Sequence, residues 1–156
     1  MKYNHTIDGM RALAVISVLI FHVAPSYVPS GFLGVDVFFV LSGYLITGII
    51  IREMDADTFS ISSFYFRRAR RIGPPLSIVL VATTVAGLVF LLPGELFELG
   101  KQVLGGILFS SNLLFWSQSG YFDSASIQKP LLHLWSLGVE EQFYLIWPPL
   151  LLLGNV

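Results

Sequence analysis

The sequence predicts an all-α protein, a polytopic bundle of transmembrane helices. Of its 156 residues, 54% are hydrophobic and only 12% are charged, whereas about 25% of the residues of a soluble domain are charged. Apolar runs long enough to cross a bilayer recur along the chain, separated by short stretches with proline, glycine or charge. About five spans are expected, at residues 7–24, 31–51, 76–92, 102–116 and 138–153.

The first two expected spans follow each other closely. Residues 7–24 have Thr6 or Asp8 as a possible N-cap and end before a turn that begins at Pro25. Residues 31–51 are long enough to cross with some tilt and carry one charge, Asp36. Small residues in the second span permit close helix packing: Ser42, Gly43, Thr47 and Gly48.

Residues 52–75 are predicted to be the one long polar connection. They contain the run RRARR at residues 67–71, and Pro74 and Pro75 close the segment. Because basic loops remain in the cytoplasm, this connection predicts a cytoplasmic N-terminus. The turn at residues 25–30 is then expected on the opposite side. Taken alone, the arginine cluster could be a topology signal without further function.

The three later spans differ in their polarity. Residues 76–92 carry no charge, whereas residues 102–116 include three polar residues in a row and are expected to pack against protein rather than lipid. After a polar segment, residues 138–153 begin with two glutamates in the first turn, where the helix dipole favours anions. An aromatic stripe shares a face with the first glutamate, and an interfacial aromatic belt is the alternative interpretation: Glu140, Phe143, Tyr144 and Trp147.

The first span carries the most distinctive polar residues. Arg11 and His22 are eleven residues apart, which places them on one helical face about 16 Å from each other. Asp8 could pair with Arg11, and Asp36 could reach His22 and fix its tautomer. A histidine in a membrane helix is a functional candidate. The alternative is an interfacial histidine whose ring is hydrogen-bonded to a backbone carbonyl.

Composition also excludes several kinds of chemistry. The chain has no cysteine, so no disulfide, thiolate metal site or protein thioester can form. No other metal site and no nucleic-acid partner are expected. The N-terminus is not expected to be a cleaved signal peptide, because Asp8 interrupts its charged region and no A-x-A pattern follows.

Four motifs resemble the acyltransferase-3 family of membrane O-acyltransferases. They are DGMRALA with His22, GFLGVDVFFVLSGYLIT, FRRARRIGP and LHLWSLGVEEQFYLIWP, and they occur in the family's order. The resemblance covers nearly the whole chain but only the N-terminal part of the family's domain, which has about ten helices. It implies an enzyme of the bacterial cytoplasmic (inner) membrane that transfers an acyl group, often acetyl, from cytoplasmic acyl-CoA to a hydroxyl of a glycan such as lipopolysaccharide or peptidoglycan.

The resemblance also assigns site residues. The family's Arg-x10-His motif matches Arg11 and His22, its R-x-x-R motif matches Arg68 and Arg71, and its S-L-x-V-E glutamate is Glu140. Arg67 and Arg70 have the same spacing as the second motif, and the pair that leads into Ile72 is preferred. The expected catalytic residues are His22, Asp36 and Glu140, and the residues expected to hold the acyl donor are Arg11, Arg68 and Arg71.

These assignments suit the chemistry. Histidine can take the hydroxyl proton near neutral pH, and arginines can anchor the phosphates of acyl-CoA. Arg11 could stabilise a developing oxyanion. No permanently bound cofactor is expected. Because the histidine is expected near the far face, the bundle must supply a channel or an intermediate acyl carrier.

Two other interpretations stay open at this stage. A non-enzymatic membrane subunit or transporter-like module could use His22, Asp36 and Glu140 to handle protons or bind a carbohydrate. The other is a truncated product without activity of its own. Five spans alone are expected to be poorly stable, because polar groups such as Asn112 and Asp36 would be left partly without neighbours, and such groups are costly when they face lipid.

Overall fold

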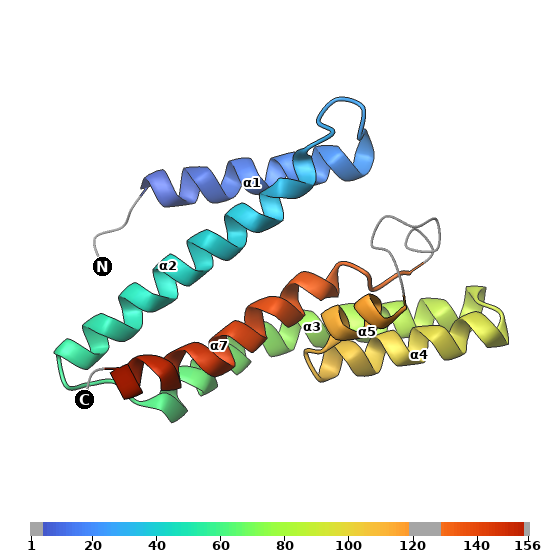
Figure 1. The fold of residues 1–156 in the computed structure, drawn as a ribbon. Helices are drawn as coiled ribbons and strands as arrows, with labels where there is room; N and C mark the ends of the chain where they lie inside the picture. The colour runs from blue at the N-terminus through green and yellow to red at the C-terminus, as the bar shows by residue number, and fades with distance from the viewer. Residues whose placement is uncertain (1–4, 119–128, 155–156) are drawn as a thin grey trace. The chain divides into compact units, whose positions relative to one another are not determined.

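The computed structural model describes residues 5–118 and 129–154, and the chain forms two compact units, Met1–Phe59 and Ser60–Val156. Within the described ranges every regular element is a helix (Figure 1), so the all-α prediction is confirmed. Three of these helical segments are long and apolar enough to cross a membrane: His5–Val23, Gly31–Asp55 and Ile61–Phe90.

The first unit is a helical hairpin. Helix α1 (His5–Val23) leads through a turn and the short 3-10 helix η1 (Gly31–Leu33) into α2 (Gly34–Asp55), which packs against α1 near the turn (Figure 1). Two glycines permit this close approach. A Cβ on Gly31 would lie 2.3 Å from the carbonyl oxygen of Ser17, and one on Gly34 would lie 2.5 Å from that of Ala14.

The described helices of the second unit are α3 (Ile61–Phe90), α4 (Pro93–Ile107), α5 (Ser111–Ser117) and α7 (Leu134–Gly154). Helix α3 packs on α4, α4 packs on α5, and α5 packs on α7 (Figure 1). The α3–α4 contact is tight at one point, where a Cβ on Gly87 would lie 2.4 Å from a methyl carbon of Leu99. Four buried leucines form the core cluster: Leu80, Leu99, Leu131 and Leu134.

The prediction that residues 52–75 form a polar connection is wrong over most of its length. Helix α2 continues to Asp55, and α3 begins at Ile61, where the Ser60 hydroxyl accepts a hydrogen bond from the Ser63 backbone N–H. The arginine run is therefore helical, which agrees with the good helix propensity of arginine. Pro74 and Pro75 lie inside α3 rather than before it, as proline does in membrane helices whose freed backbone groups find other partners.

The prediction of one helix over residues 102–116 is also wrong. Helix α4 already begins at Pro93, where the Glu95 carboxylate accepts a 2.9 Å hydrogen bond from the Leu92 N–H. The helical path breaks after Ile107, because Phe109 adopts a left-handed conformation with φ of 50°. The expected span is thus divided between α4 and α5, and each piece is shorter than a membrane crossing.

The other expected spans coincide with helices of the structure. Residues 7–24 match α1, residues 31–51 fall in η1 and α2, and residues 76–92 match the second half of α3. Residues 138–153 lie within α7, which begins at Leu134, so Glu140 and Glu141 are in its second turn and not in the first as predicted. Helix α7 is not among the segments apolar enough to cross. Most of the expected polar segment between α5 and α7 lies outside the described residues.

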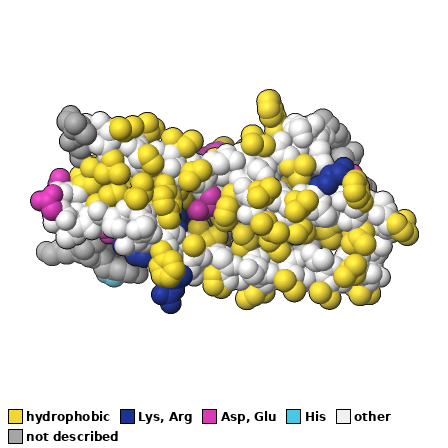
Figure 2. Space-filling view, turned by 90° about the horizontal axis from the view of Figure 1, so that it is seen from below, with side chains coloured by type: hydrophobic (Ala, Val, Ile, Leu, Met, Phe, Trp, Pro, Cys, Tyr) yellow, Lys and Arg dark blue, Asp and Glu magenta, His cyan; other side chains and the backbone are white. Residues whose placement is uncertain are grey.

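Apolar side chains dominate the surface of the long helices. Leu88, Val89 and Phe90 near the end of α3 are 64%, 71% and 82% exposed. Hydrophobic side chains cover much of the face in Figure 2, and charged side chains are few there. Apolar exposure on this scale is costly in water and suits a lipid environment.

Tyr65 on α3 forms a hydrogen bond to a backbone carbonyl of α7 that lacks its usual helical donor because of a proline. Pro149 has no N–H and cannot donate to the carbonyl of Leu145, four residues earlier in α7. The Tyr65 hydroxyl donates to that carbonyl oxygen at 2.9 Å. A backbone group left open by proline is thereby satisfied from the neighbouring helix.

Replacing this hydroxyl gives a first testable expectation. Tyr65→Phe should lower the free energy of unfolding by about 1 kcal/mol, because the Leu145 carbonyl loses its donor. In a Pro149→Ala background the same replacement should cost much less, since an alanine at this position would supply the missing backbone N–H. Thermal unfolding of the four proteins in detergent measures the difference, and equal costs in both backgrounds would contradict this role of Tyr65.

Candidate functional site

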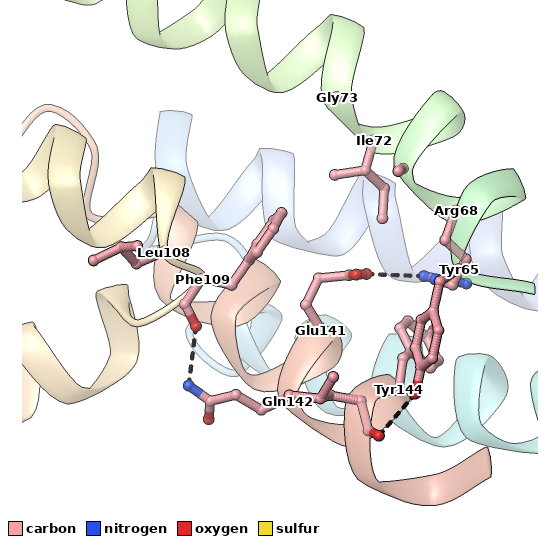
Figure 3. A pocket seen from close by; sticks show the side chains of 11 residues that line it. Tyr65, Arg68, Ile72, Gly73, Leu108, Phe109, Glu141, Gln142 and Tyr144 are labelled. Atoms are coloured by element: carbon pink, nitrogen blue, oxygen red, sulfur yellow. Dashed lines mark hydrogen bonds and ion pairs between the residues drawn. The ribbon is translucent and has the colours of Figure 1, made fainter. Parts of the chain in front are cut away.

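The second unit contains a cavity of about 500 Å³. Its walls come from α3, from the link between α4 and α5, and from α7 (Figure 3). Most of the lining is apolar, with a few polar groups from α3 and α7, which is typical of a ligand site. The lining residues are Tyr65, Arg68, Ala69, Ile72, Gly73, Leu108, Phe109, Glu141, Gln142, Tyr144 and Leu145.

An ion pair crosses this cavity from α3 to α7. The Arg68 guanidinium donates to Glu141 at 3.1 Å, and the two side chains are only 14% and 15% exposed (Figure 3). The Arg68 guanidinium carbon also lies 3.4 Å from the centre of the Tyr144 ring. Arg68 is therefore held by a carboxylate and by an aromatic face, both from α7.

Glu140 occupies a different place from its neighbour Glu141. The Tyr144 hydroxyl donates to a Glu140 carboxylate oxygen one helical turn away, and Glu140 is not among the residues that line the cavity. Phe143 and Trp147 stack at 5.3 Å between ring centres. The predicted face shared by Glu140 and the aromatic residues is confirmed, whereas the carboxylate inside the cavity is that of Glu141.

A pair of amides fixes α5 against α7 beside the cavity. Asn112 and Gln142 exchange two hydrogen bonds of 2.9 and 3.0 Å, and Gln142 also donates to the Phe109 carbonyl at 2.9 Å. Gly138 permits the approach, since a Cβ there would lie 2.8 Å from the Asn112 side-chain oxygen. The expectation that the polar residues of this segment pack against protein is confirmed, and Ser111 is only 1% exposed.

In the first unit, His22 has a defined tautomer. Its Nδ1 lies 2.8 Å from the Val18 carbonyl oxygen, and its ring is exposed and touches Phe21 edge to face. A carbonyl only accepts, so Nδ1 carries the proton and Nε2 of the neutral ring has a free lone pair. The backbone contact considered as an alternative is thus present, and it leaves a base available.

The predicted partners of the first span are not found. Asp36 lies exposed in the first turn of α2, and within the described ranges it makes no bond to His22, whose tautomer is fixed by Val18 instead. A carboxylate there is favoured by the helix dipole. No ion pair joins Asp8 to Arg11 in the described part of the unit. The half-buried Arg11 guanidinium lies 5.9 Å from the centre of the Phe38 ring.

The two arginines of the R-x-x-R motif have different surroundings. Arg68 is the largely buried one, whereas Arg71 is exposed and has no hydrogen bond or ion-pair partner among residues 5–118 and 129–154. In the alternative register, Arg67 and Arg70 are both exposed, and Arg70 lies 5.6 Å from the Phe66 ring centre. Of the four arginines, Arg68 is the one that lines the cavity.

Sequence reasoning missed the cavity residues Glu141, Tyr65 and Gln142. A signal existed for Tyr65, which precedes Arg68 by three residues and so shares its face. None existed for Glu141 over Glu140, because the side of α7 that meets α3 depends on packing. Within the described ranges no group of three acidic or histidine side chains could hold a metal ion.

Comparison with known proteins identifies a family model and several relatives, all of them acyltransferases by name. The family model described as "Acyltransferase domain" matches residues 4–155. The chain is 43% identical over 153 residues to the peptidoglycan O-acetyltransferase OatA of Listeria monocytogenes, a match that covers 97% of this chain and 24% of that protein. It is 40% identical over 156 residues to the provisionally named peptidoglycan O-acetyltransferase YrhL of Bacillus subtilis, covering 98% and 24%.

The chain thus spans about a quarter of the length of these curated relatives. No solved structure matches it.

Proposed function

Because the chain belongs to the acyltransferase-3 family, we propose that it takes part in transfer of an acetyl group to a hydroxyl of a cell-wall glycan at the bacterial membrane. Acetyl-CoA is the proposed donor, and peptidoglycan is the proposed acceptor. The names of its relatives in Listeria monocytogenes and Bacillus subtilis support this acceptor. The long apolar helices support a membrane location, and the proposed orientation places the N-terminus in the cytoplasm.

His22 carries this proposal. With Nδ1–H engaged by the Val18 carbonyl, Nε2 is the nitrogen that can accept a proton. It takes the proton of the glycan hydroxyl as that oxygen attacks the thioester carbonyl carbon. The imidazolium then returns the proton to the departing CoA thiolate, so that the base is restored.

The other residues that the sequence predicts for the site are proposed to bind the donor or to assist the base. Arg11 lies about 16 Å from His22 along α1, and its proposed part is to hold a charged group of the acyl donor rather than to contact the reacting carbonyl. Arg71 and Arg68 bind the donor, and the exposed Arg71 is suited to a phosphate. Asp36, on the first unit, and Glu140, on the second, are proposed as further catalytic residues. Asp36 lies exposed in the first turn of α2, and Glu140 accepts a hydrogen bond from the Tyr144 hydroxyl.

An acetyl-transfer assay tests the proposal. Membranes that contain the protein are incubated with acetyl-CoA labelled in the acetyl group and with de-O-acetylated peptidoglycan, and membranes without it serve as the control. We expect label in the glycan that mild alkali releases, as it does from an ester. Equal labelling of glycan by both membranes would refute the proposal and favour a non-enzymatic membrane subunit.

A further inference from the structure

The hydrogen bonding of Arg68 is incomplete in an unusual way. A guanidinium has five N–H donors, and only one hydrogen bond of Arg68 is formed within the described ranges, the bond to Glu141. Its Nε is fully buried without an acceptor, although the side chain as a whole is 14% exposed. Burial of a guanidinium is costly unless a carboxylate holds it, so Glu141 decides where Arg68 lies.

The clamp around Arg68 has a second part. The Tyr144 ring lies under the guanidinium, and the Tyr144 hydroxyl is in turn bound to Glu140. Ring and carboxylate thus fix both the plane and the direction of the guanidinium. Both come from α7, whereas Arg68 belongs to α3. An arginine held in this way keeps one orientation against the cavity (Figure 3).

Arg71, one turn later on α3, has the opposite character. It is exposed and has no hydrogen-bond or ion-pair partner in the described part of the chain. Its charge is not neutralised by a neighbouring carboxylate, whereas that of Arg68 is. A multiply charged anion is attracted more strongly by a free cation than by a neutral ion pair.

We propose that Glu141 is a positioning residue that holds the Arg68 guanidinium at the cavity wall. The two arginines of the R-x-x-R motif then have different tasks. Arg68, held by Glu141 and Tyr144, forms the part of the cavity wall that contacts the donor. Arg71 supplies the contact to the phosphates of the acyl donor, an assignment that rests on the proposed function. Glu141, rather than Glu140, is thus the acidic partner of the motif.

Two acyl donors separate the two tasks. Acetyl-CoA carries phosphates, whereas S-acetyl-pantetheine has the same thioester arm without them. Arg71→Gln should raise KM for acetyl-CoA roughly tenfold, the loss expected for one hydrogen bond to a charged group, and leave KM for acetyl-pantetheine unchanged. Arg68→Gln and Glu141→Gln should lower kcat with both donors, by up to roughly 10²-fold.

The double variant gives the decisive comparison. If Glu141 acts through Arg68, the Arg68→Gln/Glu141→Gln protein should lose no more kcat than either single variant, because one interaction is removed in all three. Arg71→Gln combined with Glu141→Gln should lower kcat/KM for acetyl-CoA by the product of the two single effects. Glu141→Asp should restore part of the rate by keeping the charge. Additive losses for Arg68 and Glu141 would overturn the proposal, as would a Glu141→Gln protein with the wild-type kcat.

Thermal unfolding in detergent gives a readout independent of activity. The shifts in Tm should be coupled between Arg68 and Glu141 and additive between Arg71 and Glu141. Glu98→Gln on α4 is the matched control, because it breaks the exposed ion pair with Lys101 at 2.7 Å in the same unit and should change neither kcat nor the coupling. If no donor is used by the wild type, the proposed function fails, while coupled or uncoupled Tm shifts still decide the role of Glu141.

Discussion

Replacing His22 with alanine should lower the rate of acetyl transfer to glycan by about 10²–10⁴-fold, the usual contribution of a general base. The Val18 carbonyl holds Nδ1–H of His22, and the exposed ring presents Nε2 as the proton acceptor. Alanine removes this acceptor, while the backbone of α1 loses nothing that it needs for its own hydrogen bonds. Initial rates per mole of membrane-inserted protein, quantified by immunoblot, measure the effect.

His5→Ala is the matched control for this experiment. His5 lies on the same helix at its other end and is also exposed. Its replacement should leave the transfer rate within about twofold of the wild type, since surface changes away from a site rarely matter. Equal losses for both histidines, or a His22→Ala protein as active as the wild type, would show that His22 is not the base.

Gly34→Ala should disrupt the helical hairpin that carries His22. The added Cβ would lie 2.5 Å from the Ala14 carbonyl oxygen and 2.7 Å from the Ser17 hydroxyl. Because the first of these atoms is backbone, a side-chain rotation cannot relieve the clash, and α1 must move away from α2. Overpacking of this kind costs about 1–3 kcal/mol, and we expect a lower Tm in detergent together with reduced acetyl transfer.

Gly48→Ala is the control for the same substitution in the same helix. A Cβ on Gly48 has one near neighbour, the flexible end of Arg52 at 3.4 Å. Alanine there should leave the Tm unchanged or raise it, because it favours the helix more than glycine does. If Gly34→Ala and Gly48→Ala had the same Tm, the close approach at Gly34 would not determine the hairpin.

The all-helical fold was predictable from the sequence, because an apolar run of membrane length can satisfy its backbone hydrogen bonds by itself only as a helix. The first two spans agree with α1 and α2 for this reason. Pro74 and Pro75 misled the prediction, since proline ends a helix in water but remains inside a packed one. The break at Phe109 is a local helix end, in which the Phe109 and Ser110 N–H groups donate to the Gly106 and Gly105 carbonyls at 3.2 and 2.8 Å. Glycine usually holds the left-handed position of such an end, so a phenylalanine there did not indicate the break.

The candidate site was predictable only where the contacts are local. The Glu140–Tyr144 contact follows from helical spacing, and so does the bond between the His22 ring and the Val18 carbonyl. The pairing of Arg68 with Glu141 joins residues 73 positions apart in sequence. Neighbouring glutamates point about 100° apart around a helix, so only the packing of α7 against α3 decides which one enters the cavity.

Chemical rescue of His22→Gly by imidazole tests the proposed base most directly. The variant removes the ring and leaves room for a free imidazole beside the exposed end of α1. If Nε2 takes the proton of the glycan hydroxyl, added imidazole should raise acetyl transfer by the variant at least tenfold and leave the wild type unchanged. A His22→Gly rate that imidazole does not alter, or that already equals the wild-type rate, would contradict the assignment of His22 as the base.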